Sequence, residues 1–123
     1  MGNIKPTILF VDDEHLICDI FTEHFELEDY TTFKRHSGKD AIEFLLSEEG
    51  QAIEVVVTDV KMNDGDGLWL IEQINKNNLQ KKVFIMTAHL EFTLEELQSR
   101  GVLHVFHKPA KFEEVQEKIE SFL

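Results

Sequence analysis

The sequence is poor in cysteine and in long apolar runs, and each shortage excludes a class of protein. Cys18 is the only cysteine among 123 residues, so no disulfide framework can form, and we expect this thiol to be buried in a helix. No apolar run approaches the roughly 20 residues that cross a bilayer, and the start, MGNIKPT, lacks the apolar core of a secretion signal. We therefore expect a cytoplasmic protein that does not act on a membrane.

Positive charge is scarce as well. The chain has 12 Lys and Arg against 24 Asp and Glu, which gives a formal net charge of −12 at pH 7. A surface this acidic repels the phosphates of nucleic acids, so direct nucleic-acid binding is not expected. The charge favours a cation or another protein as the partner.

Linker segments are also missing. The chain has 2 Pro and 6 Gly, and no Pro-, Gly- or Ser-rich stretch, repeat or low-complexity segment divides it. A chain of 123 residues suits one domain, which can bury about 65–70% of its unfolded surface. We therefore expect a single domain over residues 1–123, with no output domain in this chain.

What the sequence does contain is a regular alternation of strands and helices. Apolar and β-branched runs predict five strands, at residues 7–11, 30–35, 53–58, 83–87 and 102–106. Apolar residues at helical spacing predict five helices, at residues 15–26, 39–47, 68–75, 94–100 and 111–123. Helices of this length between strands imply crossover connections, and hence an α/β fold with a parallel sheet covered on both faces.

Polar or small side chains follow four of these strands. They are Asp12, Asp13, Glu14, Asp59, Thr87, Ala88 and Lys108. Because the carboxyl ends of parallel strands meet at one edge of the sheet, and ligands of such sheets bind there, we expect these residues to line one site.

Three carboxylates in that site need a cation. Asp12, Asp13 and Asp59 would repel one another in a shared cleft. Mg²⁺ prefers oxygen ligands and keeps several waters, so two carboxylates and a backbone carbonyl would leave it open positions for phosphoryl oxygens. The alternative is that the acids after the first strand only cap the next helix, since acids are favoured in a first turn. Asp59 speaks against that alternative, because no helix start follows it directly.

Four segments together resemble the receiver domain of bacterial two-component response regulators. They are ILFVDDE, VVVTDVKMNDGDGL, VFIMTAH and VFHKP, in this order along almost the whole chain. The resemblance implies a flavodoxin-like (βα)5 fold, a doubly wound parallel five-stranded sheet with the strand order 2-1-3-4-5. It also implies that the chain takes a phosphoryl group from a histidine kinase or a phosphotransfer protein in a Mg²⁺-dependent reaction. Its partner downstream would be a protein target or a missing output domain.

The resemblance assigns roles in the acidic site. Asp59 matches the phosphoacceptor, Asp13 the direct Mg²⁺ ligand, and Asp12 a ligand that acts mainly through water. Lys61 would offer its backbone carbonyl to the metal. The glycines that follow, Gly65 and Gly67, suggest a loop with positive φ or a close backbone approach.

Four further positions match the family near the phosphoryl group. Lys108 matches the lysine that pairs with it, and Thr87 matches the hydroxyl that moves to bond it. Ala88 matches the small residue that keeps the entrance open. His89 lies near the path of the hydrolytic water, so it either alters the hydrolysis rate or is an ordinary surface histidine.

The chain departs from the family pattern at three positions. Asn63 replaces a usual proline after the DVKM segment, and Ala110 replaces a frequent phenylalanine. Val105 occupies the position of the aromatic switch residue, and the neighbouring Phe106 should point to the opposite face of the sheet. The sequence therefore supports the phosphoryl chemistry better than the usual output mechanism.

Three alternatives remain beside a phosphoacceptor that catalyses only its own phosphorylation and dephosphorylation. A receiver-like binding module that works without phosphorylation would not need the complete acid, Thr and Lys set. A Mg²⁺-dependent phosphatase of the haloacid dehalogenase type would want a second acid where this chain has Lys61. A flavin-binding electron carrier would want a Ser/Thr/Gly-rich phosphate loop after the first strand, where the carboxylates would repel the phosphate.

Overall fold

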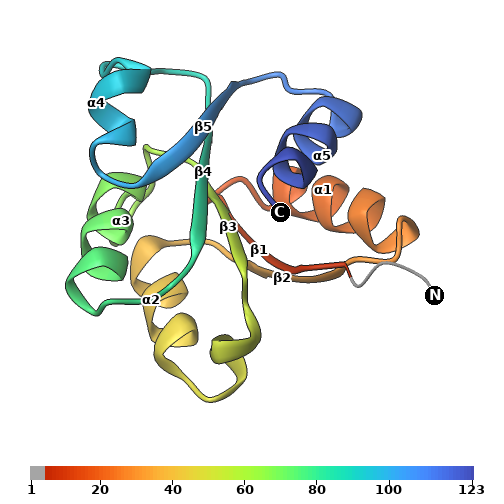
Figure 1. Cartoon of the computed structure of the whole chain (residues 1–123), viewed down its shortest axis with the longest axis horizontal. Coiled ribbons are helices and arrows are strands. Elements are labelled where there is room, and N and C mark those ends of the chain that lie inside the picture. The colour runs from red at the N-terminus through yellow and green to blue at the C-terminus, as the bar shows by residue number, and fades with distance from the viewer. Residues whose placement is uncertain (1–4) are drawn as a thin grey trace.

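The computed structural model describes residues 5–123, in which five strands alternate with five α-helices (Figure 1). The strands are β1 (Thr7–Val11), β2 (Thr31–Arg35), β3 (Val55–Thr58), β4 (Lys82–Thr87) and β5 (Val102–His107). The helices are α1 (His15–Leu27), α2 (Gly38–Leu46), α3 (Gly67–Lys76), α4 (Leu94–Gln98) and α5 (Phe112–Ser121), with a 3-10 turn η1 (Glu49–Ala52) before β3. All predicted elements are confirmed, with shifted ends.

The strands form one parallel sheet in the order β2-β1-β3-β4-β5, as the family resemblance implies. Helices α1 and α5 cover one face, and α2, α3 and α4 cover the other (Figure 1). Among the described helices, none has the length and apolar character that a membrane crossing requires. The expectation about a secretion signal rests partly on residues 1–4, which lie outside the described residues.

Side chains alternate across the sheet and form two core clusters. Leu9 packs with the residues beneath α2, α3 and α4, whereas Phe10 packs with those of α1 and α5. The same alternation separates Val105 from Phe106, which confirms that these neighbours face opposite sides. Cys18 is buried on α1, as expected.

Local side-chain chemistry fixes several helix ends. Ser37 and Asp66 accept hydrogen bonds from backbone N–H groups in the first turns of α2 and α3. Helix α4 ends earlier than predicted, because the amides of Arg100 and Gly101 bond the carbonyls three residues back and tighten the last turn. Gly101 then leaves the helix with a φ of +96°.

Candidate functional site

Strand register brings the two aspartates together. Val11 of β1 pairs with Thr58 of β3, so the next residues, Asp12 and Asp59, leave adjacent strands at the same level. The Asp59 amide donates to the Val11 carbonyl at 2.9 Å, which extends this pairing by one residue. The structure therefore brings Asp12 and Asp59 together at the carboxyl edge of the sheet.

Lys108 enters the same site from the end of β5. Its Nζ lies 2.7 Å from Asp12 Oδ2, 2.9 Å from Asp59 Oδ2 and 3.2 Å from Glu14 Oε1. Asp12 has no Lys or Arg beside it in the sequence, yet the fold supplies a cation from 96 positions away. The Lys108–Pro109 bond is cis, an isomer that the sequence alone could not decide.

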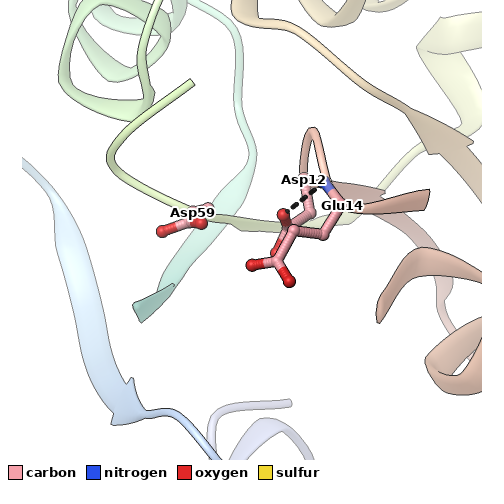
Figure 2. A group of neighbouring side chains, drawn as sticks. All are labelled: Asp12, Glu14 and Asp59. Atoms are coloured by element: carbon pink, nitrogen blue, oxygen red, sulfur yellow. Dashed lines mark hydrogen bonds between the residues drawn. The ribbon is translucent and has the colours of Figure 1, made fainter. Parts of the chain in front are cut away.

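The third carboxylate of the cluster is Glu14 rather than Asp13. One carboxylate oxygen from each of Asp12, Glu14 and Asp59 lies within 4.8 Å of the others, and Figure 2 shows Asp12 and Glu14 on the turn after β1. The Glu14 amide donates to Asp12 Oδ1 at 2.9 Å, and this tight turn holds the two residues together (Figure 2). Asp13 instead is exposed and lines a shallow pocket beside Lys61.

The sequence predicts that Asp13 and Glu14 both line the site, but it assigns a ligand role to Asp13 and none to Glu14. A signal was present, because residues two apart in an extended segment lie on the same side, and Asp12 and Glu14 are two apart.

Burial and ion pairing act against each other in this cluster. Burial lowers the pKa of Lys108, but its hydrogen bonds to Asp12 and Asp59 outweigh that effect and raise the pKa above its ordinary value. Burial raises the pKa of Asp12, and the bonds from Lys108 and the Glu14 amide only partly offset this effect. Lys108 is therefore a firmly protonated ammonium at neutral pH.

Thr87 lies at the end of β4 with its hydroxyl turned toward the following loop. Its Oγ1 donates to the His89 carbonyl at 3.1 Å and accepts from the His89 amide at 3.3 Å. Thr87 is buried, whereas Ala88 and His89 are exposed in the loop that follows it. Thr87 would have to leave both His89 bonds before it could reach a group on Asp59.

The loop after β3 is held close to Asp59. Asp59 Oδ1 accepts from the Val60 amide at 2.7 Å, and the Gly67 amide donates to the Val60 carbonyl at 2.7 Å. A Cβ on Gly67 would lie 2.0 Å from the Asp59 carbonyl oxygen, and Gly65 has a φ of +92°. Both sequence expectations for these glycines, a close backbone approach and a positive φ, are confirmed.

The side chains of Lys61 and Val105 make their contacts outside the acidic cluster. The Lys61 ammonium lies 3.9 Å from Glu91 Oε1 on the surface, so its side chain points to solvent. Val105 is buried beneath α4 in the cluster that contains Leu97 and Val102. An aromatic ring at position 105 is absent, and the space beneath α4 is filled by aliphatic side chains.

Comparison with known proteins agrees with this architecture. The family model of the response regulator receiver domain matches residues 8–120. Sporulation initiation phosphotransferase F of Bacillus subtilis is 29% identical over 121 residues, which cover 98% of this chain and 95% of that protein. Transcriptional regulatory protein ZraR of Escherichia coli is 31% identical over 94% of this chain, which spans only 26% of ZraR.

Solved structures give the same result. Response regulator TrrA of Thermotoga maritima, solved in complex with Mg²⁺-BeF, has a TM-score of 0.80 and 26% identity, with 96% of this chain and 99% of that chain covered. A CheY-like receiver domain protein of Methanospirillum hungatei has a TM-score of 0.84 at 23% identity, with 97% and 94% covered, which supports the fold alone. Because the family model matches residues 8–120, nearly the whole of this chain, the chain belongs to the response regulator receiver domain family.

Proposed function

We propose that Asp59 is the phosphoacceptor of this receiver domain. The observation that carries the proposal is the 2.9 Å contact between Lys108 Nζ and Asp59 Oδ2, which places a fixed positive charge at an almost buried carboxylate. An Asp59 oxygen would attack phosphorus, and the bond between phosphorus and the donor would break, with the electron pair leaving on the donor. Lys108 would neutralise the charge on the phosphoryl oxygens. The donor is a histidine kinase or a phosphotransfer protein.

Asp59→Asn is expected to abolish phosphoryl uptake. With acetyl phosphate and Mg²⁺, the wild type should gain one phosphoryl group that is lost at alkaline pH, and intact mass spectrometry should detect it. Asp40→Asn is the matched control, because Asp40 is an exposed acid on α2. Uptake by Asp59→Asn at the wild-type level would disprove the assignment.

We also propose that Mg²⁺ binds beside Asp59, held by Asp12, Asp13, Asp59 and the backbone carbonyl of Lys61. The chemistry of the donors supports this proposal, because the site offers oxygen ligands, which Mg²⁺ prefers, and includes buried carboxylates that repel one another. Bound there, Mg²⁺ would supply positive charge to phosphoryl oxygens. The Lys61 side chain is paired with Glu91, so the role proposed for Lys61 rests on its backbone carbonyl alone.

Mg²⁺ is expected to stabilise the fold, because it binds the folded site and not the unfolded chain. Saturation at a hundred times the dissociation constant adds about 2.7 kcal/mol to the free energy of unfolding, measurable by urea titration. Asp13→Ala should lose most of this gain, and Glu14→Gln should keep it. Equal stabilisation of Asp13→Ala and wild type would place the ion elsewhere.

The output step is proposed to run through the loop after β4. The Thr87 hydroxyl holds this loop through His89, so its movement toward a phosphoryl group would release residues 88–93. Val105 is short and stiff at χ1 and offers no ring to move, so coupling to β5 should be weak. We also propose that His89, which is bonded to Thr87 through its backbone and has an exposed side chain, changes the rate of phosphoryl hydrolysis in one direction or the other.

Val105→Tyr is expected to enlarge the response of β5. In the wild type, a beryllofluoride mimic should shift amide NMR signals strongly near Asp59, Thr87 and Lys108 and less within β5. The added ring should increase the β5 shifts, since it can pack differently in the two states. If the wild type already shows large β5 shifts that Val105→Tyr leaves unchanged, this account of output is wrong.

The downstream partner is proposed to be a protein surface or an output domain. ZraR is named a transcriptional regulatory protein and is about four times as long as this chain, which supports the second option. We further propose that the domain acts in the cytoplasm and has no substrate apart from its own phosphoryl group. The family membership supports both proposals.

A further inference from the structure

Glu14 occupies the N-cap position of α1 but does not cap the helix. Its backbone is extended, and its side chain accepts no hydrogen bond from the first turn of α1. The carboxylate instead reaches across the edge of the sheet to Lys108 Nζ at 3.2 Å. Glu14 is therefore part of the charge arrangement at the site and does not cap the helix.

Glu14 is the outermost of the three carboxylates around Lys108. Its side chain is 63% exposed, compared with 4% for Asp12, 9% for Asp59 and 12% for Lys108. Glu14 also borders a pocket of about 390 Å³ that Lys108 and Ala88 line. A phosphodonor that approaches Lys108 from this pocket meets the Glu14 charge first.

The charge balance of the cluster disfavours an incoming anion. Before any metal binds, three carboxylates around one ammonium leave a net charge of −2, and Glu14 keeps its negative charge at the outer edge when a cation joins the other two. The negative charge of Glu14 repels a donor dianion. Glu14 also holds the Lys108 ammonium in an ion pair, and the phosphoryl oxygens need that ammonium. To receive these oxygens, Lys108 must give up Glu14, whose charge then lies beside the transferred group.

We propose that Glu14 selects the phosphodonor, by disfavouring small free dianions relative to donors that bring less negative charge to the site. The proposal rests on the proposed phosphoacceptor function of Asp59. The reaction itself is unchanged: an Asp59 oxygen bonds phosphorus while acetate leaves acetyl phosphate with the electron pair of the broken bond. Glu14 makes and breaks no covalent bond, and it acts through Lys108 and through its field.

The test compares two donors of different charge in Glu14→Gln. At neutral pH acetyl phosphate is a dianion and phosphoramidate carries less negative charge. With saturating Mg²⁺ and low salt, the rate constant of phosphorylation by acetyl phosphate should rise about 3–10-fold in Glu14→Gln, the size expected for one unit charge near a dianion in water-like surroundings. The rise should be smaller with phosphoramidate and should shrink as salt screens the charge.

Two further variants separate this role from structural effects. Glu23→Gln removes the same charge from another exposed position on α1 and should leave both rates unchanged. Glu14→Asp keeps the charge and should stay near the wild-type donor ratio. Thermal unfolding confirms that each variant is folded.

The outcomes are distinct. Equal rates for wild type and Glu14→Gln, or the same gain with both donors at all salt concentrations, would overturn the proposal. A slower Glu14→Gln with weakened Mg²⁺ binding would also overturn it, because Glu14 would then be a metal ligand. If the wild type gains no phosphoryl group from either donor, the proposed function of Asp59 fails instead.

Discussion

Replacing Lys108 with methionine is expected to lower the free energy of unfolding by about 3 kcal/mol at neutral pH without Mg²⁺. The reason is that removing the ammonium leaves the negative charges of its buried carboxylate partners uncompensated. Asp12 and Asp59 are nearly buried and would face each other without a cation. Burial raises the pKa of Asp12, and protonation of this carboxylate relieves the repulsion, so the loss should shrink as the pH falls through the pKa of Asp12. In the wild type, the raised pKa of Lys108 means that its contribution persists at neutral pH and is lost only as alkaline pH removes the ammonium proton.

Urea unfolding of Lys108→Met at neutral and acidic pH, with and without Mg²⁺, measures this effect. Added Mg²⁺ should restore more stability in the variant than in the wild type, because it no longer competes with the ammonium for the carboxylates. Lys34→Met is the control, since Lys34 forms an exposed pair with Asp19 at 2.6 Å, and it should change stability little. A loss in Lys108→Met that responds to neither pH nor Mg²⁺ would contradict the explanation.

Gly67→Ala is expected to disrupt both the fold and the site. The new Cβ would lie 2.0 Å from the carbonyl oxygen and 2.9 Å from the carbonyl carbon of Asp59, so the backbone there must move. Such overpacking costs about 1–3 kcal/mol of stability. A shift of about 1 Å at a reacting group can cost roughly a hundredfold in rate. Phosphoryl uptake from acetyl phosphate should therefore fall steeply even in the folded fraction.

Gly101→Ala provides the matched glycine control. Gly101 has a φ of +96°, and a Cβ there would meet only Asn75 Oδ1 at 3.7 Å, so the change costs about 1–2 kcal/mol of backbone strain and no collision. Its phosphoryl uptake, measured by mass spectrometry on folded protein, should match the wild type. Equal uptake by the two alanine variants would show that the contact with Asp59 is unimportant for the chemistry.

The strands and their order were accessible from sequence for a physical reason. A strand such as β3, VVVT, is buried on both faces, and a fully apolar β-branched run is the pattern that such a strand requires. The ends of the elements were less accessible, because they depend on local bonds. Residue 53, for example, is outside β3 because its amide completes the η1 turn by bonding the Gly50 carbonyl.

In the site, the residues that topology brings together could be predicted, whereas the side-chain conformations could not. Topology brings Asp12, Asp59 and Lys108 to one edge, and the sequence predicts that meeting from strand ends alone. Whether Glu14 or Asp13 turns toward Lys108 depends on side-chain conformations after β1, which strand periodicity suggests but does not determine. The bonds from Thr87 to His89 likewise arise from the shape of one loop.

The path of the chain through the site sets an order of events during protein synthesis. Asp12 and Asp59 leave the ribosome early, but their counter-ion arrives only with the strand that carries residue 108. A nascent chain that ends within α4 has both aspartates but not yet Lys108, the lysine that pairs with them. Its β4 also lacks the neighbouring strand β5. If Asp59 is the phosphoacceptor, as proposed, the site is therefore completed only late in translation, when β5 joins the sheet.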